Sequence, residues 1–396
     1  EVIQMNKFKL KTVDVWDTIL RRNCHPDFIK RSTAYYFFLK YHKNHNIDSV
    51  DQLFAKRVEI EHAIGQENKA LGYDDEYLIQ DVMQQWVENY ISAEQHDTAA
   101  ISNELYTWEM EQEKKTIYLD PGIKDFLAQY PADTTLFLSD FYTSADDLKK
   151  LLHSAGMDTS IIADGISSVD ERLNKRSGQL FDFVQKKYQL SPADWVHIGD
   201  NEWSDVKIPA AKGINSIRYL PTEQHQLREQ KESLWHNNEA LTETLINKII
   251  QEHAKSENLP VDFLLGLKTT PLIAGFCLKI LEQAISSNSE KILFFTREGE
   301  FFIKAFDVLS NHLKTSISDT KLPEIDILEV SRLATFAPSL QEISLKEMMR
   351  VWNLYSTQSI NALFKTLNVD TTEFQSFIDK YEIPADEQIQ YPWQDS

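Results

Sequence analysis

The stretch "TVDVWDTILRR", residues 12–22, decides how the first part of the chain folds. A β-branched, apolar run leads to Asp14, and Asp17 and Thr18 follow within four residues. This pattern predicts a buried strand that ends in a polar turn. A carboxylate at that position can act as a nucleophile toward phosphorus when a cation neutralises the approaching phosphate. An ordinary strand cap, with Asp17 and Thr18 bonded to backbone amides, fits the same residues.

Three further stretches place polar side chains at the ends of strands or the beginnings of helices. In "LFLSDFYTSADDL" (136–148), Ser139 follows a buried strand, a position suited to a phosphoryl oxygen or to a helix cap. In "RLNKRSGQLFDFV" (172–184), Lys175 precedes a Ser-Gly turn that begins a helix. In "WVHIGDNEWSDVK" (195–207), Gly199 permits a tight turn, and Asp200 and Asp205 are spaced to hold a hard cation such as Mg²⁺.

The alternation of short strands with helical patterns predicts an α/β fold with a doubly wound, mostly parallel sheet. The ligand site of such a sheet lies beyond the carboxyl ends of its strands, so these polar endings should meet at one edge. We expect a core over residues 1–24 and 119–230, interrupted by a helical cap insertion over 25–118. A second α/β domain, Rossmann-like and truncated, is expected over 235–396.

Composition limits the classes of partner. The net charge of -20 argues against a broad interface with DNA or RNA, because the nucleic-acid backbone is also negative. Cys24 and Cys277 are far apart, which excludes a disulfide framework or zinc-thiolate spacing and fits a reducing cytoplasm. We expect no transmembrane segment, although a peripheral location at the inner membrane through partners stays open. Both ends look cut, so we expect further domains in a longer polypeptide.

Taken together, the four stretches resemble the haloacid dehalogenase-like (HAD superfamily) hydrolases, which are mostly Mg²⁺-dependent phosphatases. The resemblance covers residues 8 to about 222. It implies that Asp14 forms an aspartyl-phosphate and that Ser139 and Lys175 hold the phosphoryl oxygens. It also places a helical cap after the first motif, as in one large branch of the superfamily. The other expected substrate contacts are Thr18, Asp140, Arg297 and Arg332.

The resemblance further implies that Asp14, the Trp16 carbonyl and Asp200 bind Mg²⁺, with Asp205 supporting the metal or Lys175. Trp16 departs from the pattern, because most phosphatases of the superfamily carry a second Asp there as the general acid. We therefore consider Asp17 as the proton donor.

Dehalogenating members also carry an aromatic residue at the Trp16 position, so a C–halogen hydrolase is an alternative. The acid pair Asp200 and Asp205 argues against it, because dehalogenases need no metal. A catalytically weak scaffold that binds phosphosugars within a larger glycan polymerase is a second alternative.

The last third contains two arginines that follow predicted strands. Arg297 follows "KILFF" and Arg332 follows "IDILEV", so the two can form a phosphate site, unless each pairs with a local acid such as Glu298. The arrangement resembles hydrolase modules of bacterial capsule and O-antigen synthesis. That resemblance implies a phosphatase acting on a sugar phosphate, such as a ribofuranosyl 5-phosphate, beside a phosphoribosyl- or glycosyl-transferring module that takes phosphoribosyl pyrophosphate.

Overall fold

The computed structural model describes residues 7–43, 46–162, 164–235, 247–252, 260–317, 321–330, 332–352 and 359–388. Two compact units are found, which we call the first unit (Glu1–Asn288 with Leu313–Lys321) and the second unit (Ser289–His312 with Leu322–Ser396). The predicted α/β class, with a parallel sheet and an inserted set of helices, is confirmed. The predicted domain boundary near residue 235 stays a prediction.

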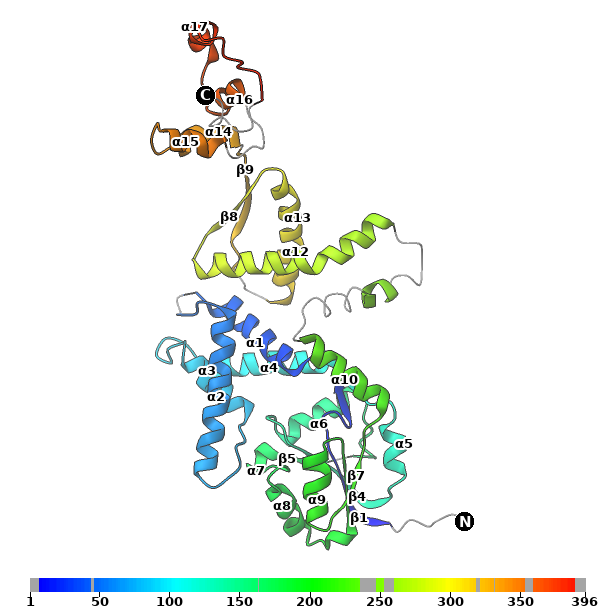
Figure 1. Ribbon diagram of the computed structural model, residues 1–396. Helices are drawn as coiled ribbons and strands as arrows, with labels where there is room; N and C mark the ends of the chain where they lie inside the picture. Colours follow the sequence, from blue (N-terminus) through cyan, green and yellow to red (C-terminus); the bar gives the residue numbers. More distant parts are fainter. Residues whose placement is uncertain are drawn as a thin grey trace. The chain divides into compact units, whose positions relative to one another are not determined.

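A five-stranded parallel sheet forms the centre of the first unit (Figure 1). Its spatial order is β5-β4-β1-β6-β7, and each neighbouring pair is parallel. The strands run over β1 (Phe8–Val13), β4 (Ala132–Ser139), β5 (Asp164–Ser167), β6 (Trp195–Gly199) and β7 (Asn215–Arg218). Val13 is in register with Phe137 on one side and with Ile198 on the other. The three central strands therefore end at the same edge.

Helices cover both faces of this sheet because successive strand residues point to opposite sides. On one face, residues such as Val13 and Phe137 pack against α5 and α6. On the other, Leu10 and Trp195 pack against α8. The bounds are α5 (Ile123–Ala128), α6 (Ala145–Ser154), α7 (Ser168–Glu171), α8 (Gln179–Tyr188), α9 (Ile208–Ala211) and α10 (Thr222–Trp235). This is the doubly wound arrangement that the sequence predicts.

A helical insertion leaves the core after β1 and returns before α5. Two three-residue strands, β2 (Leu20–Arg22) and β3 (Ile117–Leu119), form an antiparallel pair at its base. This strand pair was not predicted from the sequence. Between its strands lie α1 (Pro26–Tyr41), α2 (Val50–Ala70), α3 (Ile79–Glu88) and α4 (Thr98–Thr116), which we call the cap.

A buried ion-pair network joins three of the cap helices. Arg57 of α2 is fully buried, and its guanidinium donates to both carboxylate oxygens of Glu109 on α4 and to Glu61 (2.9 Å). The Thr33 hydroxyl of α1 donates to Glu109 (2.7 Å), and Lys30 donates to Glu61 (2.6 Å). Because burial removes these charges from water, each needs its partner.

The longest helix of the chain is α12 (Val261–Ser286), in the first unit. By length and composition it can cross a membrane, contrary to the expectation that no stretch would qualify. Only 11% of its most apolar 18-residue window is buried among the described residues.

The second unit contains two parallel strands followed by short helices. Strand β8 (Lys291–Phe295) pairs with β9 (Glu324–Leu328), and α13 (Glu298–Ser316) lies between them in sequence. The chain continues through α14 (Arg332–Ser339), α15 (Leu345–Trp352), α16 (Ile360–Thr366), a short 3₁₀ turn (Thr371–Phe374) and α17 (Gln375–Lys380). This is the strand-helix-strand arrangement that the sequence predicts.

The cap network gives a stability prediction. Glu109→Gln removes the carboxylate that binds both Arg57 Nη atoms and leaves this buried guanidinium with Glu61 alone, so the free energy of unfolding should fall by about 3 kcal/mol. Urea unfolding of the intact chain, followed by tryptophan fluorescence, measures this as an earlier first transition. The matched control is Glu111→Gln on the same helix, because Glu111 is half exposed and pairs only with Lys114 at the surface. Equal shifts for the two variants would refute a structural role for the network.

Candidate functional site

The site lies at the carboxyl ends of β1, β4 and β6, where Asp14, Ser139 and Asp200 follow or end the strands. Asp14 is buried, and its backbone N–H donates to the Ile198 carbonyl of β6 (2.8 Å). The adjacent parallel strands therefore bring together the polar endings that the sequence analysis predicted to meet.

The turn after β1 holds the Asp14 carboxylate in place. The buried Thr18 hydroxyl donates to Asp14 Oδ2 (3.0 Å), and Asp17 has a left-handed backbone with φ of 59°, which Asp tolerates better than most residues. The Trp16 ring packs on Phe141, with centroids 4.5 Å apart, and the Arg22 guanidinium lies 3.6 Å from its centroid. The indole thus packs between Phe141 and Arg22 beside the site, at the position where most phosphatases of the resembled superfamily carry an acid.

Lys175 is the cation at the centre of the site. Its side chain is 2% exposed, and its ammonium group donates to Asp14 Oδ1 and to Asp205 Oδ1 (2.6 Å). The Lys175 backbone N–H donates to Asp140 Oδ1 (2.8 Å), so Asp140 fixes the loop that carries the lysine. The predicted substrate contact Asp140 is thus placed where it holds Lys175.

Asp205 reaches the site through a tight turn after β6. The Asn201 N–H donates to Asp205 Oδ2 (3.0 Å), and the Asp205 N–H donates to the Asn201 carbonyl (3.0 Å). A Cβ atom at Gly199 would fall on the Asp205 carboxyl group, so only glycine lets the two approach. A wide π-type turn, Glu202–Lys207, follows, a feature found often at functional sites.

The sequence analysis missed a buried chain of hydrogen bonds beneath Asp205. The Trp195 indole N–H donates to Thr12 Oγ1 (2.9 Å), which contacts His197 Nδ1 (2.8 Å). His197 Nε2 faces Asp205 Oδ1 (3.1 Å), and burial lowers the pKa of His197, so the ring is neutral. Because a carboxylate only accepts, Nε2 carries the proton and Thr12 donates to Nδ1. The chain orients Asp205 toward Lys175.

The charges of the site are not balanced. Burial raises the pKa of Asp14 well above its usual value; Lys175 opposes this, and the nearby Asp205 and Asp200 reinforce it. Burial also acts to raise the pKa of Asp205, but Lys175 and His197 outweigh it, and that pKa is lowered. Lys175 alone therefore does not offset the cost of burying the Asp14 carboxylate beside two other acids.

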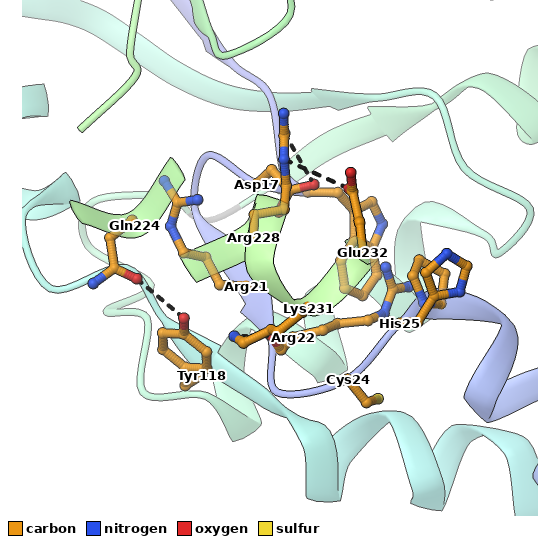
Figure 2. A pocket seen from close by; sticks show the side chains of 12 residues that line it. Asp17, Arg21, Arg22, Cys24, His25, Tyr118, Gln224, Arg228, Lys231 and Glu232 are labelled. Atoms are coloured by element: carbon orange, nitrogen blue, oxygen red, sulfur yellow. Dashed lines mark hydrogen bonds and ion pairs between the residues drawn. The ribbon is translucent and has the colours of Figure 1, made fainter. Parts of the chain in front are cut away.

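A second cation that the sequence analysis missed lies beside Asp200. Arg228 of α10 donates to Asp200 Oδ2 (2.7 Å) and forms a 3.4 Å ion pair with Asp17 Oδ2, shown in part in Figure 2. Burial, then Asp17 and Asp205, raise the pKa of Asp200, although Arg228 opposes the shift.

The carboxylates fit a divalent metal ion. Asp14, Asp200 and Asp205 are buried, and one ligand atom from each lies within 4.8 Å of the others. Carboxylate oxygens are the ligands that Mg²⁺ prefers, and a cation would relieve the uncompensated charge of Asp14 and Asp200. The metal contact of the Trp16 carbonyl stays a prediction.

Ser139 offers an unused polar group at this edge. Its side chain is fully buried, and within the described part of the chain its hydroxyl has no hydrogen-bond partner. A buried polar group without a partner costs about 1–3 kcal/mol, which a bound acceptor would recover. This is the property expected of a group that holds a phosphoryl oxygen.

The cap contributes to the site through the loop between α2 and α3. Asp74 accepts hydrogen bonds from the Asn174 N–H (2.8 Å) and the Ser177 hydroxyl (2.6 Å), on either side of Lys175. Glu76 Oε1 accepts a hydrogen bond from the side-chain Nδ2 of Asn174 (3.0 Å). No sequence motif indicated these contacts, which join the position of the cap to that of the lysine.

The two predicted arginines of the second unit are only partly described. Arg297 is exposed, follows β8 and has a left-handed backbone with φ of 77°. Arg332 begins α14 after β9, but its side chain lies outside the described residues. Since β8 and β9 are parallel and Phe295 is in register with Leu328, both arginines follow the same ends of paired strands. Their convergence on one phosphate stays a prediction.

Comparisons with known proteins give structural likeness at low identity. No family model matches the chain, and no curated protein matches it. A 2-haloacid dehalogenase from Pseudomonas syringae pv. tomato DC3000 is 15% identical over 54% of this chain and 86% of that one, with a TM-score of 0.41. A haloacid dehalogenase-like hydrolase from Xanthomonas campestris is 12% identical over 57% and 91%, with a TM-score of 0.37.

The HAD-hydrolase YfnB from Bacillus subtilis, solved bound to magnesium, is 16% identical over 55% of this chain and 92% of that one, with a TM-score of 0.33. All three are HAD-like proteins. Because each TM-score is below 0.5, the interpretation of this chain's chemistry rests on its own residues.

The acidic cluster predicts metal-dependent stability. Mg²⁺ should raise the unfolding temperature of the wild type, and Asp200→Asn should abolish that rise, because a bound ligand stabilises the folded state by mass action. The metal-free variant should be no less stable, since the folded pKa of Asp200 is raised above its unfolded value and its charge costs stability at neutral pH. Thermal scans with Mg²⁺ and with chelator measure both effects.

The matched control for this prediction is Asp194→Asn, a surface acid paired with Lys9, which should retain the full response to Mg²⁺. An undiminished response in Asp200→Asn would place the metal elsewhere.

Proposed function

We propose that the first unit is a Mg²⁺-dependent phosphatase of the HAD type that hydrolyses a phosphomonoester. The observation that carries the proposal is the buried contact of Lys175 with Asp14 at the sheet edge where the Ser139 hydroxyl has no hydrogen-bond partner among the described residues. A nucleophilic carboxylate, a fixed ammonium group and a free hydroxyl donor at one sheet edge are the groups that phosphoryl transfer requires.

In this proposal Asp14 attacks the phosphorus atom, the bond from phosphorus to the ester oxygen breaks, and the phosphoryl group is transferred to the carboxylate. Water then hydrolyses the acyl phosphate and regenerates Asp14. Lys175 and Ser139 donate to the phosphoryl oxygens, and Thr18 orients the nucleophile through Oδ2. A metal ion held by Asp14, Asp200 and Asp205 would supply charge neutralisation for the approaching phosphate.

The leaving oxygen needs a proton, and Trp16 cannot supply one. We retain Asp17 as the proposed donor, because it is three residues from the nucleophile in the same turn. Its carboxylate lies against Arg228, so the donation requires the Arg228 contact to loosen. The Trp16 and Phe141 rings pack against each other on this side of the site.

A C–halogen hydrolase is the competing activity, because an aromatic residue at position 16 suits a leaving group that needs no proton. The buried pair Asp200 and Asp205 favours the phosphatase, because it completes a cation site that displacement of a halide does not use. A phosphosugar-binding scaffold without turnover is the third candidate.

We further propose a sugar phosphate as the substrate, such as a ribofuranosyl 5-phosphate formed during synthesis of a surface polysaccharide. The support is the sequence resemblance to modules of capsule and O-antigen assembly, together with two strand-end arginines in the second unit.

Removal of the nucleophile tests the catalytic proposal. Asp14→Asn should lower turnover of p-nitrophenyl phosphate and of a panel of sugar phosphates by at least about a thousandfold, because the covalent intermediate cannot form. Phosphate release is measured with Mg²⁺ and with chelator, and 2-haloacids are tested in parallel. The matched control is the exposed Asp146→Asn. Activity that survives in Asp14→Asn contradicts the mechanism, and turnover of haloacids alone would establish the dehalogenase.

For the second unit we propose binding of a phosphorylated sugar donor, with phosphoribosyl pyrophosphate as the first candidate. Arg297→Ala and Arg332→Ala should each weaken binding by about tenfold or more, because each removes a charge-assisted contact. Calorimetric titration of the intact chain measures the affinity, and the exposed Lys380→Ala is the control. Absence of binding in the wild type, or unchanged affinity in both arginine variants, would make this unit a scaffold.

A further inference from the structure

A small pocket opens beside the proposed catalytic site, between the β2–β3 strand pair and α10 (Figure 2). Trp16 and Asp17 of the catalytic turn form one side of it, and its volume is about 40 Å³. That volume holds about three water molecules, and a carboxylate or a phosphate group is of similar size. Neither the proposed mechanism nor the sequence resemblance assigns this pocket a role.

The lining of the pocket is rich in positive charge. Arg21, Arg22, Arg228 and Lys231 line it, against the two acids Asp17 and Glu232. Carboxylates behind the lining also pair with three of these cations: Asp120 with Arg21, Glu113 with Arg22 and Asp200 with Arg228. Lys231 forms no ion pair with a described carboxylate, so it is the cation best placed to attract an anion into the pocket.

Several donors of this lining have hydrogen atoms to spare. Arg21 is 3% exposed, and among the described residues its Nη2 has no hydrogen-bond partner, although its Nε donates to Asp120. The Trp16 Nε1 atom is likewise buried and makes no hydrogen bond within the described chain, whereas Arg228 Nε lies 3.7 Å from Glu232 Oε1. The Arg21 and Trp16 nitrogens are closed to solvent, so they lie behind the pocket wall rather than against its contents.

Lys231 adds a cation that is only lightly engaged. The one hydrogen bond shown for its ammonium group goes to the Arg22 carbonyl (2.7 Å), which leaves two of its three protons. Burial lowers the pKa of Lys231, as expected for an ammonium group partly removed from water without a carboxylate in contact. An anion in the pocket would stabilise the charged form of Lys231, which burial disfavours.

We propose that this pocket binds a second oxyanion of the substrate, a carboxylate or a phosphate, while Asp14 attacks the phosphoryl group. The proposal rests on the phosphatase function and narrows its substrate to phosphomonoesters that carry another acidic group. Asp17 and Arg228 belong to the pocket and also approach Asp200, so pocket and catalytic site share a wall. The two anionic groups of the substrate are therefore separated by a short framework, such as a single sugar.

Three substrates on one glucose framework distinguish the possible anions. Glucose 6-phosphate has no second anion, 6-phosphogluconate adds a carboxylate, and glucose 1,6-bisphosphate adds a phosphate. The wild-type chain with Mg²⁺ should show a kcat/KM about tenfold or more higher for at least one of the two probes with a second acidic group than for glucose 6-phosphate. The preferred probe identifies the oxyanion.

Lys231→Met should reduce this preference about tenfold, because it removes the charge and keeps much of the side-chain volume, whereas Lys231→Arg should retain most of it. The matched control Lys212→Met removes a surface lysine paired with Asp182 and should leave the preference unchanged. Circular dichroism and the unfolding midpoint of each variant check that the fold is intact. Equal kcat/KM for all three probes, or a preference that Lys231→Met does not alter, overturns the proposal while the phosphatase stands.

Direct binding separates failure of the pocket from failure of the enzyme. Calorimetry with the Asp14→Asn chain and Mg²⁺ should show tighter binding of the preferred probe with a second acidic group than of glucose 6-phosphate, and Lys231→Met in that background should remove the difference. If the wild type hydrolyses nothing but this difference is found, the proposed function fails and the anion pocket stands. If titration shows no Lys231-dependent difference, the pocket is not an anion site.

Discussion

The site depends on one buried ammonium group shared by two carboxylates. Lys175 contacts both Asp14 and Asp205, and all three side chains are nearly inaccessible to water. Removal of a lysine from water is costly, and only close opposite charges offset that cost. Burial and the neighbouring carboxylates nevertheless raise the pKa of Asp14, so its ionised form is not fully stabilised by Lys175. A further cation beside Asp14 would favour the ionised carboxylate that the proposed phosphoryl transfer requires.

Several features of the fold serve to hold this contact. Parallel pairing aligns the ends of β1 and β6, Gly199 makes room for the Asp205 carboxyl group, and His197 fixes its orientation from below. Asp140 holds the lysine loop from the core and Asp74 holds it from the cap. Movement of the cap would therefore move the loop that carries Lys175, and the position of the cap bears directly on the electrostatics of the nucleophile.

The sequence predicted the sheet and the residues at its strand ends, because alternation of apolar residues and strand-end position are local signals. Asp14, Ser139 and Asp200 follow directly from those signals. The β2–β3 strand pair was missed because each strand has only three residues. Arg228 lies on a mostly polar helix, and His197 lies inside an apolar strand, so their roles arise only from tertiary contacts. The anion pocket likewise forms from segments about 100 residues apart, which no local pattern can indicate.

The central claim is that Asp14 accepts a phosphoryl group. A structure of the chain with Mg²⁺ and beryllium fluoride tests it most directly, because beryllium trifluoride bound to a carboxylate mimics an aspartyl-phosphate. The account predicts beryllium trifluoride on an Asp14 oxygen, with Lys175 and the Ser139 hydroxyl in contact with its fluorine atoms. A fully occupied Mg²⁺ site with no beryllium trifluoride on Asp14 would contradict it.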